Sequence, residues 1–260
     1  MHRKIIRNQL HQGERVYGIH VCNLGGSHAV KKVSNLDLDF VFIDMEHIPI
    51  DRSEVSLMCR YYSAKGISPV VRIPYPNPHF ASAAIDGGAE GIVVPYVEIV
   101  EEVRPLVGAV HYRPLKGKML NEHLLKTRLL KEETIRYLEQ LNPYNYLIIG
   151  IESVPAYERL DELIGVEGVD AVFIGPHDLS VSMEIPEQYS HPDFIQVVMD
   201  IIHRSRIKGL GAGMHLKPDN SNSEQIKQYM DAGMNWILYS QDTDLLSDKT
   251  TEVLKRLRSL

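Results

Sequence analysis

Charged side chains stand at the ends of several apolar runs in this sequence. Asp44, Arg72 and Glu152 each close a short run rich in valine and isoleucine, and Asp178 closely follows another. Burying such groups costs several kcal/mol unless they are paired or bind something. We therefore expect these four residues to have a function.

Glu152 and Asp178 are candidates for metal binding. Two hard oxygen ligands with open coordination positions suit magnesium or manganese, which keep several waters and accept further oxygens from a substrate. Each carboxylate could instead cap the helix that follows its strand. Ser153, Gly175 and Pro176 end the same two runs and are expected to bind the substrate.

His47 and Arg72 are candidates for catalysis. His47 closely follows two acidic residues, and with Asp44 nearby its imidazole could act as general acid and base. A surface or structural role is the alternative. Arg72 lies inside an apolar run, which indicates a carboxylate or enolate partner, or else a structural ion pair with Asp44 or Glu46.

Other basic side chains also fall near the ends of apolar runs. His20, His28 and His215 could line a pocket or belong to the core. The amine of Lys217 could form a Schiff base with a carbonyl substrate. Its neighbours at 218–220 indicate an exposed turn instead, so this role is disfavoured.

The elements that must position these residues are buried strands. Eight apolar runs are nearly continuous in hydrophobicity, which is typical of strands buried on both faces of a parallel sheet. Amphipathic stretches between them fit helices, for example at 154–163, 193–208, 223–232 and 244–257. The repeated strand–helix order predicts an α/β fold, a (β/α)₈ TIM barrel with catalytic residues at the C-terminal ends of its strands. The runs are 16–21, 40–45, 68–74, 91–96, 147–152, 171–176, 211–215 and 236–240.

Two of the strand–helix units are longer than the others. The stretch 96–147 contains HYRPLKGK and a further helical run, and the stretch 176–211 contains several prolines. Both insertions are expected as loops on the catalytic face. A single domain over residues 1–260 is favoured. A doubly wound, two-domain protein is the alternative, but Gly25 and Gly26 lack the dinucleotide-binding spacing.

Composition excludes several classes of protein. The chain has 260 residues, 44% hydrophobic and 24% charged, which rules out disorder, collagen and coiled coil. With 28 basic against 34 acidic residues, it lacks the basic footprint of a nucleic-acid-binding protein. The apolar runs are too short to span a membrane, and no signal peptide is recognisable. Its two cysteines lack paired spacing, so a cytoplasmic location is expected.

Several segments of the chain resemble the HpcH/HpaI family of class II pyruvate aldolases. The resemblance implies a (β/α)₈ barrel that binds a divalent metal and makes or cleaves 4-hydroxy-2-oxo acids, giving pyruvate and an aldehyde through a metal-stabilised enolate. The segment from strand five to strand six, ending in GPHDLS, is the most specific. The matching segments are FVFIDMEHIP, SPVVRIP, AIDGGAEGIVVPYV, GIESVPAYERLDELIGVEGVDAVFIGPHDLS and GMNWILYSQDTDLL.

The resemblance also implies roles for individual residues. The metal ligands of the family fall on Glu152 and Asp178, and its pyruvate-binding arginine falls on Arg72. Its catalytic histidine falls on His47, supported by Asp44. An aspartate at a subunit interface near the site falls on Asp86. Family members are typically hexamers, trimers of dimers in which partners exchange the last helix.

The chain departs from the family pattern after strand four. It reads HYRPLKGKML there, with Lys118 in the place of an arginine. Lys116 and Lys118, beside Arg113, are expected to form a positive rim over the site that favours an anionic acceptor. Because the acceptor half differs, two alternatives remain open: a citrate-synthase-like transferase that joins a 2-oxo acid to an acyl-coenzyme A, and a binding protein without catalysis.

Overall fold

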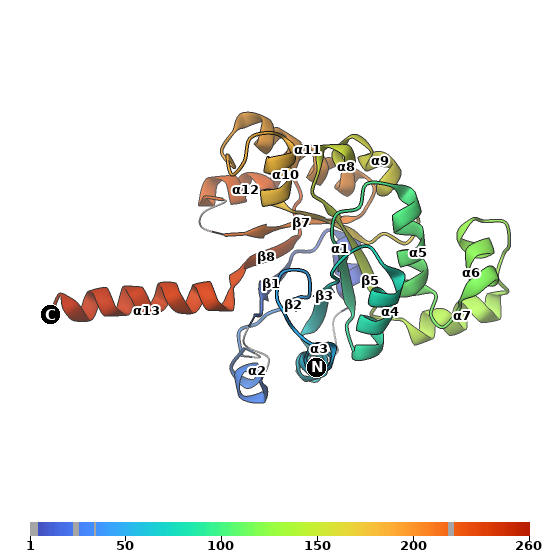
Figure 1. The fold of residues 1–260 in the computed structure, drawn as a ribbon, viewed down its shortest axis with the longest axis horizontal. Helices are drawn as coiled ribbons and strands as arrows, with labels where there is room; N and C mark the ends of the chain where they lie inside the picture. Colours follow the sequence, from blue (N-terminus) through green and yellow to red (C-terminus); the bar gives the residue numbers. More distant parts are fainter. Residues whose placement is uncertain (1–4, 23–25, 34, 218–220) are drawn as a thin grey trace.

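The computed structural model describes residues 5–22, 26–33, 35–217 and 221–260. Eight parallel strands close into a barrel in sequence order, and β1 pairs with both β2 and β8 (Figure 1). The predicted barrel is confirmed, and each predicted run matches a strand to within two residues at either end. The strands are β1 (Val16–His20), β2 (Phe40–Asp44), β3 (Ser68–Arg72), β4 (Gly91–Val94), β5 (Tyr146–Ile151), β6 (Ala171–Ile174), β7 (Gly211–Leu216) and β8 (Trp236–Gln241).

Helices connect the strands around the outside of the barrel. The stretch predicted at 154–163 is divided into two short helices, and the other three predicted helices are present to within two residues. The helices are α1 (Ile6–Gln12), α2 (Ser27–Val33), α3 (Arg52–Ser63), α4 (Pro78–Gly87), α5 (Val100–His111), α6 (Gly117–Leu124), α7 (Glu132–Leu141), α8 (Val154–Glu158), α9 (Leu160–Leu163), α10 (Pro176–Ser182), α11 (Pro192–Ile207), α12 (Ser223–Asp231) and α13 (Asp242–Arg258).

Alternate residues of each strand face the interior of the barrel. Phe40, Phe42, Phe173 and Trp236 pack there in one buried cluster, with the rings of Phe40 and Trp236 stacked 4.5 Å apart. Counting onward by twos from this cluster gives the polar layer at the C-terminal mouth. The polar residues of that layer include His20, Asp44, Arg72, Glu152, His215 and Ser240, and Gly175 lies at the same level after β6.

Two glycines make room for the large interior rings. A Cβ on Gly18 would overlap the ring of Phe40, and a Cβ on Gly213 would overlap the carbonyl oxygen of Trp236. The aromatic rings therefore fill the barrel below the polar layer and form an apolar floor beneath it.

A buried carboxylate ties elements together at the opposite, N-terminal end of the barrel. The two oxygens of Asp170 lie 3.3 Å from His11 Nε2 and 3.0 Å from His111 Nε2, and one of them accepts the N–H of Leu147. Burial alone would raise the pKa of Asp170, but the charge and hydrogen bonds of its partners lower it. Asp170 therefore contributes stability in its ionised form.

We expect Asp170→Asn to lower the free energy of unfolding by about 2–3 kcal/mol at pH 7, because it removes a buried, paired charge. A carboxylate whose folded-state pKa is depressed stabilises the fold above its unfolded pKa of about 3.9 and stops doing so as the pH falls through the folded value. Urea unfolding at pH 7 and pH 3 measures this, with the exposed Asp231→Asn as control. An equal loss at both pH values would attribute the effect to packing rather than charge.

The first insertion lies on the opposite face from the one predicted. Helix α5 starts shortly after β4 and runs back along the barrel, so its last residue, His111, contacts Asp170 at the N-terminal end of β6. Helices α6 and α7 follow from that end, beside α5 (Figure 1). The second insertion, between α10 and α11, lies at the catalytic mouth as predicted, because Glu187 there is 3.6 Å from His177.

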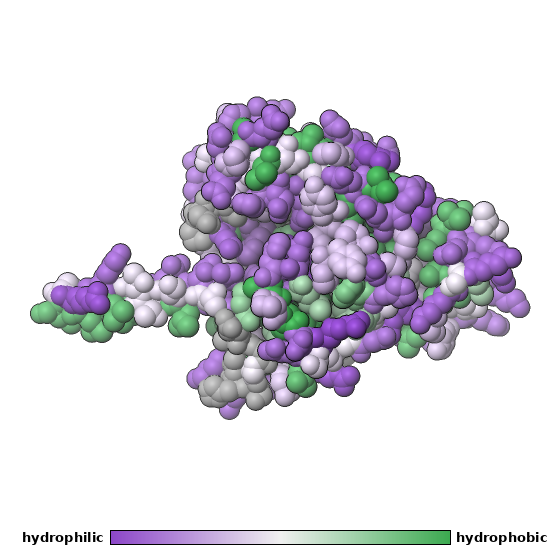
Figure 2. All heavy atoms as spheres, viewed as in Figure 1, coloured by the Kyte–Doolittle hydropathy of each residue, from purple (hydrophilic) through white to green (hydrophobic). Residues whose placement is uncertain are grey.

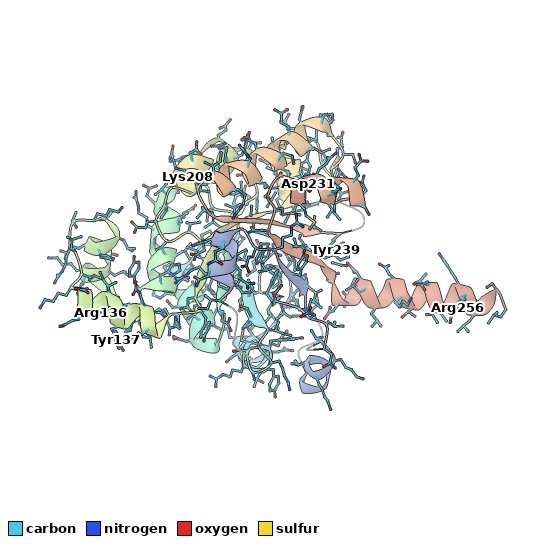
Figure 3. The ribbon with its side chains drawn as sticks, turned by 180° about the vertical axis from the view of Figure 1, so that it is seen from behind. Arg136, Tyr137, Lys208, Asp231, Tyr239 and Arg256 are labelled. Carbon is cyan, nitrogen blue, oxygen red and sulfur yellow. The ribbon has the colours of Figure 1, made fainter. Side chains whose placement is uncertain are left out.

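The last helix, α13, projects away from the barrel (Figure 1). In the view from behind, Tyr239 lies near its root and Arg256 far out along it, while Arg136 and Tyr137 mark α7 on the other side of the molecule (Figure 3). Asp242 is its one buried residue. Within the described ranges, no helix is both long enough and apolar enough to cross a membrane.

Candidate active site

Arg72 and Asp44 form an ion pair at the ends of β3 and β2. The two residues are neighbours in the strand register, and Arg72 donates from Nε to Oδ1 of Asp44 (2.9 Å) and from Nη2 to Oδ2 (2.6 Å). The guanidinium also lies over the Phe42 ring, 5.5 Å from its centroid. Burial alone would raise the pKa of Asp44, but the hydrogen bonds and charge of Arg72 lower it. The pair is therefore charged at neutral pH.

Glu46 is a second carboxylate on Arg72. Its Oε2 lies 3.1 Å from Nη1 of Arg72 and 3.6 Å from Nε2 of His47. Burial raises the pKa of Glu46, and the charge of Arg72 opposes that rise. Arg72 thus forms the ion pair with Asp44 and Glu46 that the sequence analysis gave as an alternative. Two of its five N–H groups donate hydrogen bonds, both to Asp44, while Glu46 adds an ion pair at Nη1, so the remaining N–H groups can serve a ligand.

The expectation that Asp44 supports the His47 ring is wrong. Oδ1 of Asp44 accepts the backbone N–H groups of Glu46 (2.9 Å) and His47 (3.5 Å), so it holds the turn after β2. The acidic group beside the ring is Glu46. Strand alternation points Asp44 inward to Arg72, whereas His47 lies beyond the strand with its side chain 62% exposed.

Glu152 is a buried carboxylate with one oxygen unpaired. Its Oε2 accepts the backbone N–H of Tyr96 (3.0 Å), and its Oε1 has no hydrogen-bond partner. A Cβ on Gly175 would come within 2.8 Å of that oxygen, so glycine is needed here to leave room for the carboxylate. Burial raises the pKa of Glu152 to about 7, with Glu46 and Asp178 adding to the rise and Arg72 opposing it.

The helix-cap alternative does not account for the two proposed metal ligands. Helix α8 is capped by Ser153, whose Oγ accepts the N–H of Ala156 (3.2 Å) and donates to Glu98 (2.5 Å). Helix α10 begins at Pro176 with no capping hydrogen bond. Asp178 lies in its first turn, half-exposed, 3.8 Å from the His177 ring.

The charges around Glu152 leave a place for a cation. Four carboxylates lie close enough for their negative charges to interact: Asp44, Glu46, Glu152 and Asp178. Arg72 forms ion pairs with Asp44 and Glu46. In the part of the chain that the structure describes, no three His, Cys, Asp or Glu side chains form a complete metal-binding group. Two carboxylates, one with an unpaired oxygen, fit a hard divalent cation that takes its other ligands from water and substrate.

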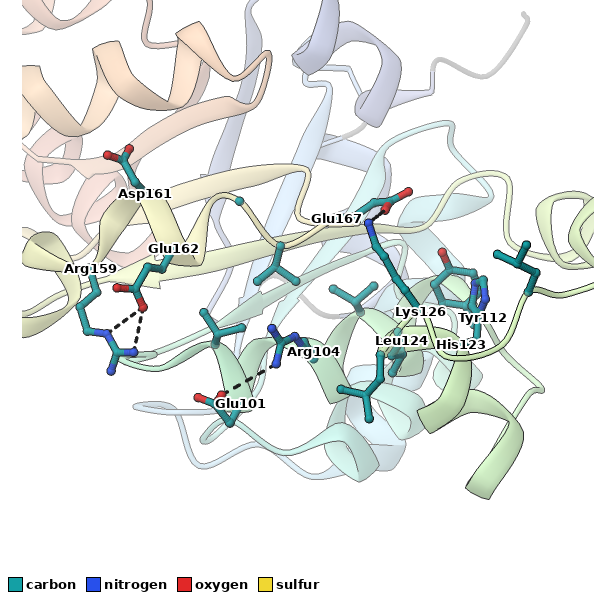
Figure 4. A pocket seen from close by; sticks show the side chains of 16 residues that line it. Glu101, Arg104, Tyr112, His123, Leu124, Lys126, Arg159, Asp161, Glu162 and Glu167 are labelled. Atoms are coloured by element: carbon teal, nitrogen blue, oxygen red, sulfur yellow. Dashed lines mark hydrogen bonds and ion pairs between the residues drawn. The ribbon is translucent and has the colours of Figure 1, made fainter.

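A groove of about 830 Å³ on the outside of the barrel is not this site (Figure 4). It runs between α5, α6 and α9 and contains none of the residues predicted for catalysis. Its walls carry the ion pairs Arg159–Glu162, Arg104–Glu101 and Lys126–Glu167.

Comparison with known families decides the classification. The model of the HpcH/HpaI aldolase/citrate lyase family matches residues 23–240, which includes every strand from β2 to β7 and nearly all of β8. The chain belongs to this family. The resemblance noted from the sequence is thereby confirmed.

HpcH/HpaI relatives match most of the chain. A pyruvate aldolase of Rhizobium etli is 33% identical over 83% of this chain and 83% of its own. A hydroxypyruvate/pyruvate aldolase of Roseovarius nubinhibens is 29% identical over 89% and 88%. Among solved structures, an HpcH/HpaI aldolase from Desulfitobacterium hafniense has a TM-score of 0.83 and is 24% identical, over 98% of this chain and 97% of its own. The citrate synthase SbnG has a TM-score of 0.81 and is 25% identical, also over 98% of this chain and 97% of its own.

Two residues assigned from the HpcH/HpaI resemblance lie away from the mouth within one chain. Lys118 is on α6, at the N-terminal face, with its side chain 88% exposed and paired with Glu122. The expected positive rim over the site is therefore wrong. Asp86 lies at the end of α4, on the same far face, and is bonded to Arg113. The side chain of His28 lies outside the described residues, and so do residues 218–220.

Proposed function

We propose that this protein is a divalent-metal-dependent carbon–carbon lyase, an aldolase that makes or cleaves 4-hydroxy-2-oxo acids. The observation that carries the proposal is the unpaired Oε1 of Glu152, buried among carboxylates beside Arg72. The substrate class is a 2-oxo acid with an aldehyde. Two relatives, a hydroxypyruvate/pyruvate aldolase and a pyruvate aldolase, support this class.

Glu152 and Asp178 would hold the metal, with magnesium or manganese the best matched to two oxygen ligands. A divalent cation at this position supplies polarisation of the substrate carbonyl. The N–H groups of Arg72 that do not donate to Asp44 bind oxygens of the 2-oxo acid, in a buried position where such hydrogen bonds are strong. The aromatic floor of Phe42 and Phe173 excludes water from below.

His47 is placed to move the proton of the aldol hydroxyl. Its ring lies at the mouth, with Nε2 3.6 Å from Glu46, and Glu46 also contacts Arg72. In cleavage the ring takes the hydroxyl proton, and in synthesis it returns it. Because the ring is 62% exposed, a water can partly replace it.

We expect His47→Ala to slow aldol cleavage about 10²-fold, at the lower end of what general base catalysis supplies. Exchange of the methyl protons of pyruvate, followed by NMR in deuterated buffer, should slow far less, because it involves no aldol hydroxyl. The exposed His203→Ala serves as control. Equal losses in both assays would place His47 in a shared step or in structure.

A condensing transferase of the citrate synthase type is the second candidate. The structural likeness to SbnG covers nearly the whole chain. Product analysis separates the candidates: pyruvate with aldehydes on one side, oxaloacetate with acyl-coenzyme A on the other. Formation of a 4-hydroxy-2-oxo acid supports the aldolase, formation of a citrate-like product supports the transferase, and turnover of neither pair indicates a binding protein.

We also propose a homo-oligomer, a hexamer built as a trimer of dimers, in which α13 packs on a partner subunit. Helix α13 projects from its own barrel, and several of its leucines are exposed to solvent. Figure 2 shows apolar residues along one edge of this helix. An unpartnered amphipathic helix is stabilised by burial against a second copy. If Asp86 contributes to catalysis, it does so in the active site of a neighbouring subunit. Light scattering of the full chain and of a chain ending at residue 241 tests this, and equal masses would contradict it.

The compartment proposed for this protein is the cytoplasm. Cys22 and Cys59 are both free thiols, and free thiols suit a reducing environment.

A further inference from the structure

Two histidines lie at the mouth on either side of β8, near the buried carboxylate of Asp242. His20 ends β1 and His215 lies near the end of β7, both in the polar layer above the aromatic floor. Their rings meet edge to face with centroids 5.6 Å apart. The proposed metal ligands follow β5 and β6, whereas the two imidazoles lie on β1 and β7.

His20 lies next to the proposed substrate-binding arginine. Its ring packs edge-on against Phe42, with centroids 5.2 Å apart, and the guanidinium of Arg72 lies over the same Phe42 ring at 5.5 Å. Asp44 and Arg72 both act electrostatically on His20. A 2-oxo acid held by Arg72 therefore has His20 beside it.

One nitrogen of His20 has no partner. Its Nε2 lies 3.5 Å from Sγ of Cys22, and its Nδ1 is buried without a hydrogen bond, although the residue is only 5% exposed. His215 is held by the carbonyl of Ser240, 3.1 Å from its Nε2. Leaving a buried ring nitrogen without a hydrogen bond is unfavourable, and a ligand group can supply that bond.

Both imidazoles are neutral at pH 7. Burial lowers the pKa of His20 to about 4 and that of His215 to about 3. A neutral imidazole offers one N–H donor and one acceptor nitrogen, and carries no charge for a carboxylate or phosphate. The group that suits it is a hydroxyl, which can donate or accept.

We propose that Nδ1 of His20, backed by His215, binds a hydroxyl group on the carbon next to a reacting carbonyl, so that the site prefers hydroxylated substrates. This inference rests on the proposed aldolase function. The hydroxyl can belong to the donor, as in hydroxypyruvate against pyruvate, or to the acceptor, as in glycolaldehyde against acetaldehyde. In either case the hydroxyl group is the feature recognised.

The test measures kcat/KM of the magnesium-loaded full chain for the four donor–acceptor pairs. Wild type is compared with two variants of His20. His20→Leu removes the ring nitrogens, and His20→Asn places a polar atom close to the Nδ1 position. The control is His203→Leu, on the outside of α11. We expect His20→Leu to lower the preference for the hydroxylated substrate, taken as the ratio of kcat/KM for the hydroxylated and the unsubstituted compound, about tenfold. His20→Asn should recover part of that preference.

The arm in which the preference changes identifies whether the hydroxyl is on the donor or the acceptor. An unchanged ratio in both arms, with turnover intact, would overturn the inference while leaving the aldolase function in place. If no pair turns over in wild type, the aldolase function fails. Calorimetric titration with pyruvate and hydroxypyruvate, and with acetaldehyde and glycolaldehyde, then decides the inference. Tighter binding of a hydroxylated compound that is lost in His20→Leu supports it, and equal binding overturns it.

Discussion

Glu152→Gln should lower the rate of aldol cleavage by 10³-fold or more at ordinary magnesium concentrations. Glutamine has nearly the same volume and can still accept the N–H of Tyr96, but its amide oxygen lacks the charge that holds a hard cation. The loss should appear first as a higher magnesium concentration needed for half-maximal rate. Kinetics over a magnesium titration measure it.

The control for this substitution is Glu158→Gln, an exposed change on the neighbouring helix α8 that should leave activity unchanged. The metal-free Glu152→Gln protein should unfold at no lower temperature than metal-free wild type, because burial already disfavours the charged form of Glu152. Asp178→Asn should weaken metal binding in the same direction. Full activity of Glu152→Gln would show that Glu152 is structural.

Arg72→Lys should lower kcat/KM by about 10²–10³-fold. Lysine keeps the positive charge, but a point ammonium cannot reproduce two parallel hydrogen bonds to Asp44 and still present a planar set of N–H groups to a substrate. The predicted loss in kcat/KM equals the loss that follows when one hydrogen-bond donor to the negative oxygen of a transition state is removed. Steady-state kinetics below the melting temperature of the variant measure it.

The matched control is Arg204→Lys, which alters an ion-paired arginine on the outer helix α11. It should cost little stability and no activity, because exposed ion pairs contribute little. Turnover of Arg72→Lys close to that of wild type would return Arg72 to a purely structural ion pair with Asp44 and Glu46.

The sequence predicted the strands well because burial on both faces leaves a signal that needs no tertiary information. A run such as 171–176 is apolar throughout, and few other elements of that length are. The same logic located Asp44, Arg72 and Glu152, since a charged residue that closes such a run must lie at a strand end.

The errors came from contacts between elements. Helix α5 (Val100–His111) runs back to the N-terminal end of the barrel before the insertion begins. The length of the stretch 96–147 does not show on which face it lies, so the insertion carrying Lys118 was assigned to the wrong face of the barrel. The partner of Arg72 could not be chosen from spacing alone, because Asp44 and Glu46 are both within reach, and the structure uses both.

The pairing of Glu46 with His47 and the unpaired nitrogen of His20 were also beyond the sequence. The first depends on side-chain direction beyond the end of β2, where alternation no longer applies, and the second depends on which groups of the neighbouring strands reach the His20 ring. His20 was noted only as a residue near a strand end, and its ring contact with Phe42 comes from two different strands.

The most direct test of the account is metal dependence of carbon–carbon bond cleavage. Pyruvate release from a 4-hydroxy-2-oxo acid is measured before chelation, after removal of metal with EDTA and after addition of magnesium or manganese, with a parallel sample treated with pyruvate and borohydride. The account predicts that chelation abolishes pyruvate release, that either metal restores it, and that borohydride leaves no adduct on any lysine, including Lys217, which lies 3.7 Å from Asp244. Undiminished cleavage after chelation, together with a lysine-linked pyruvate adduct, would contradict it.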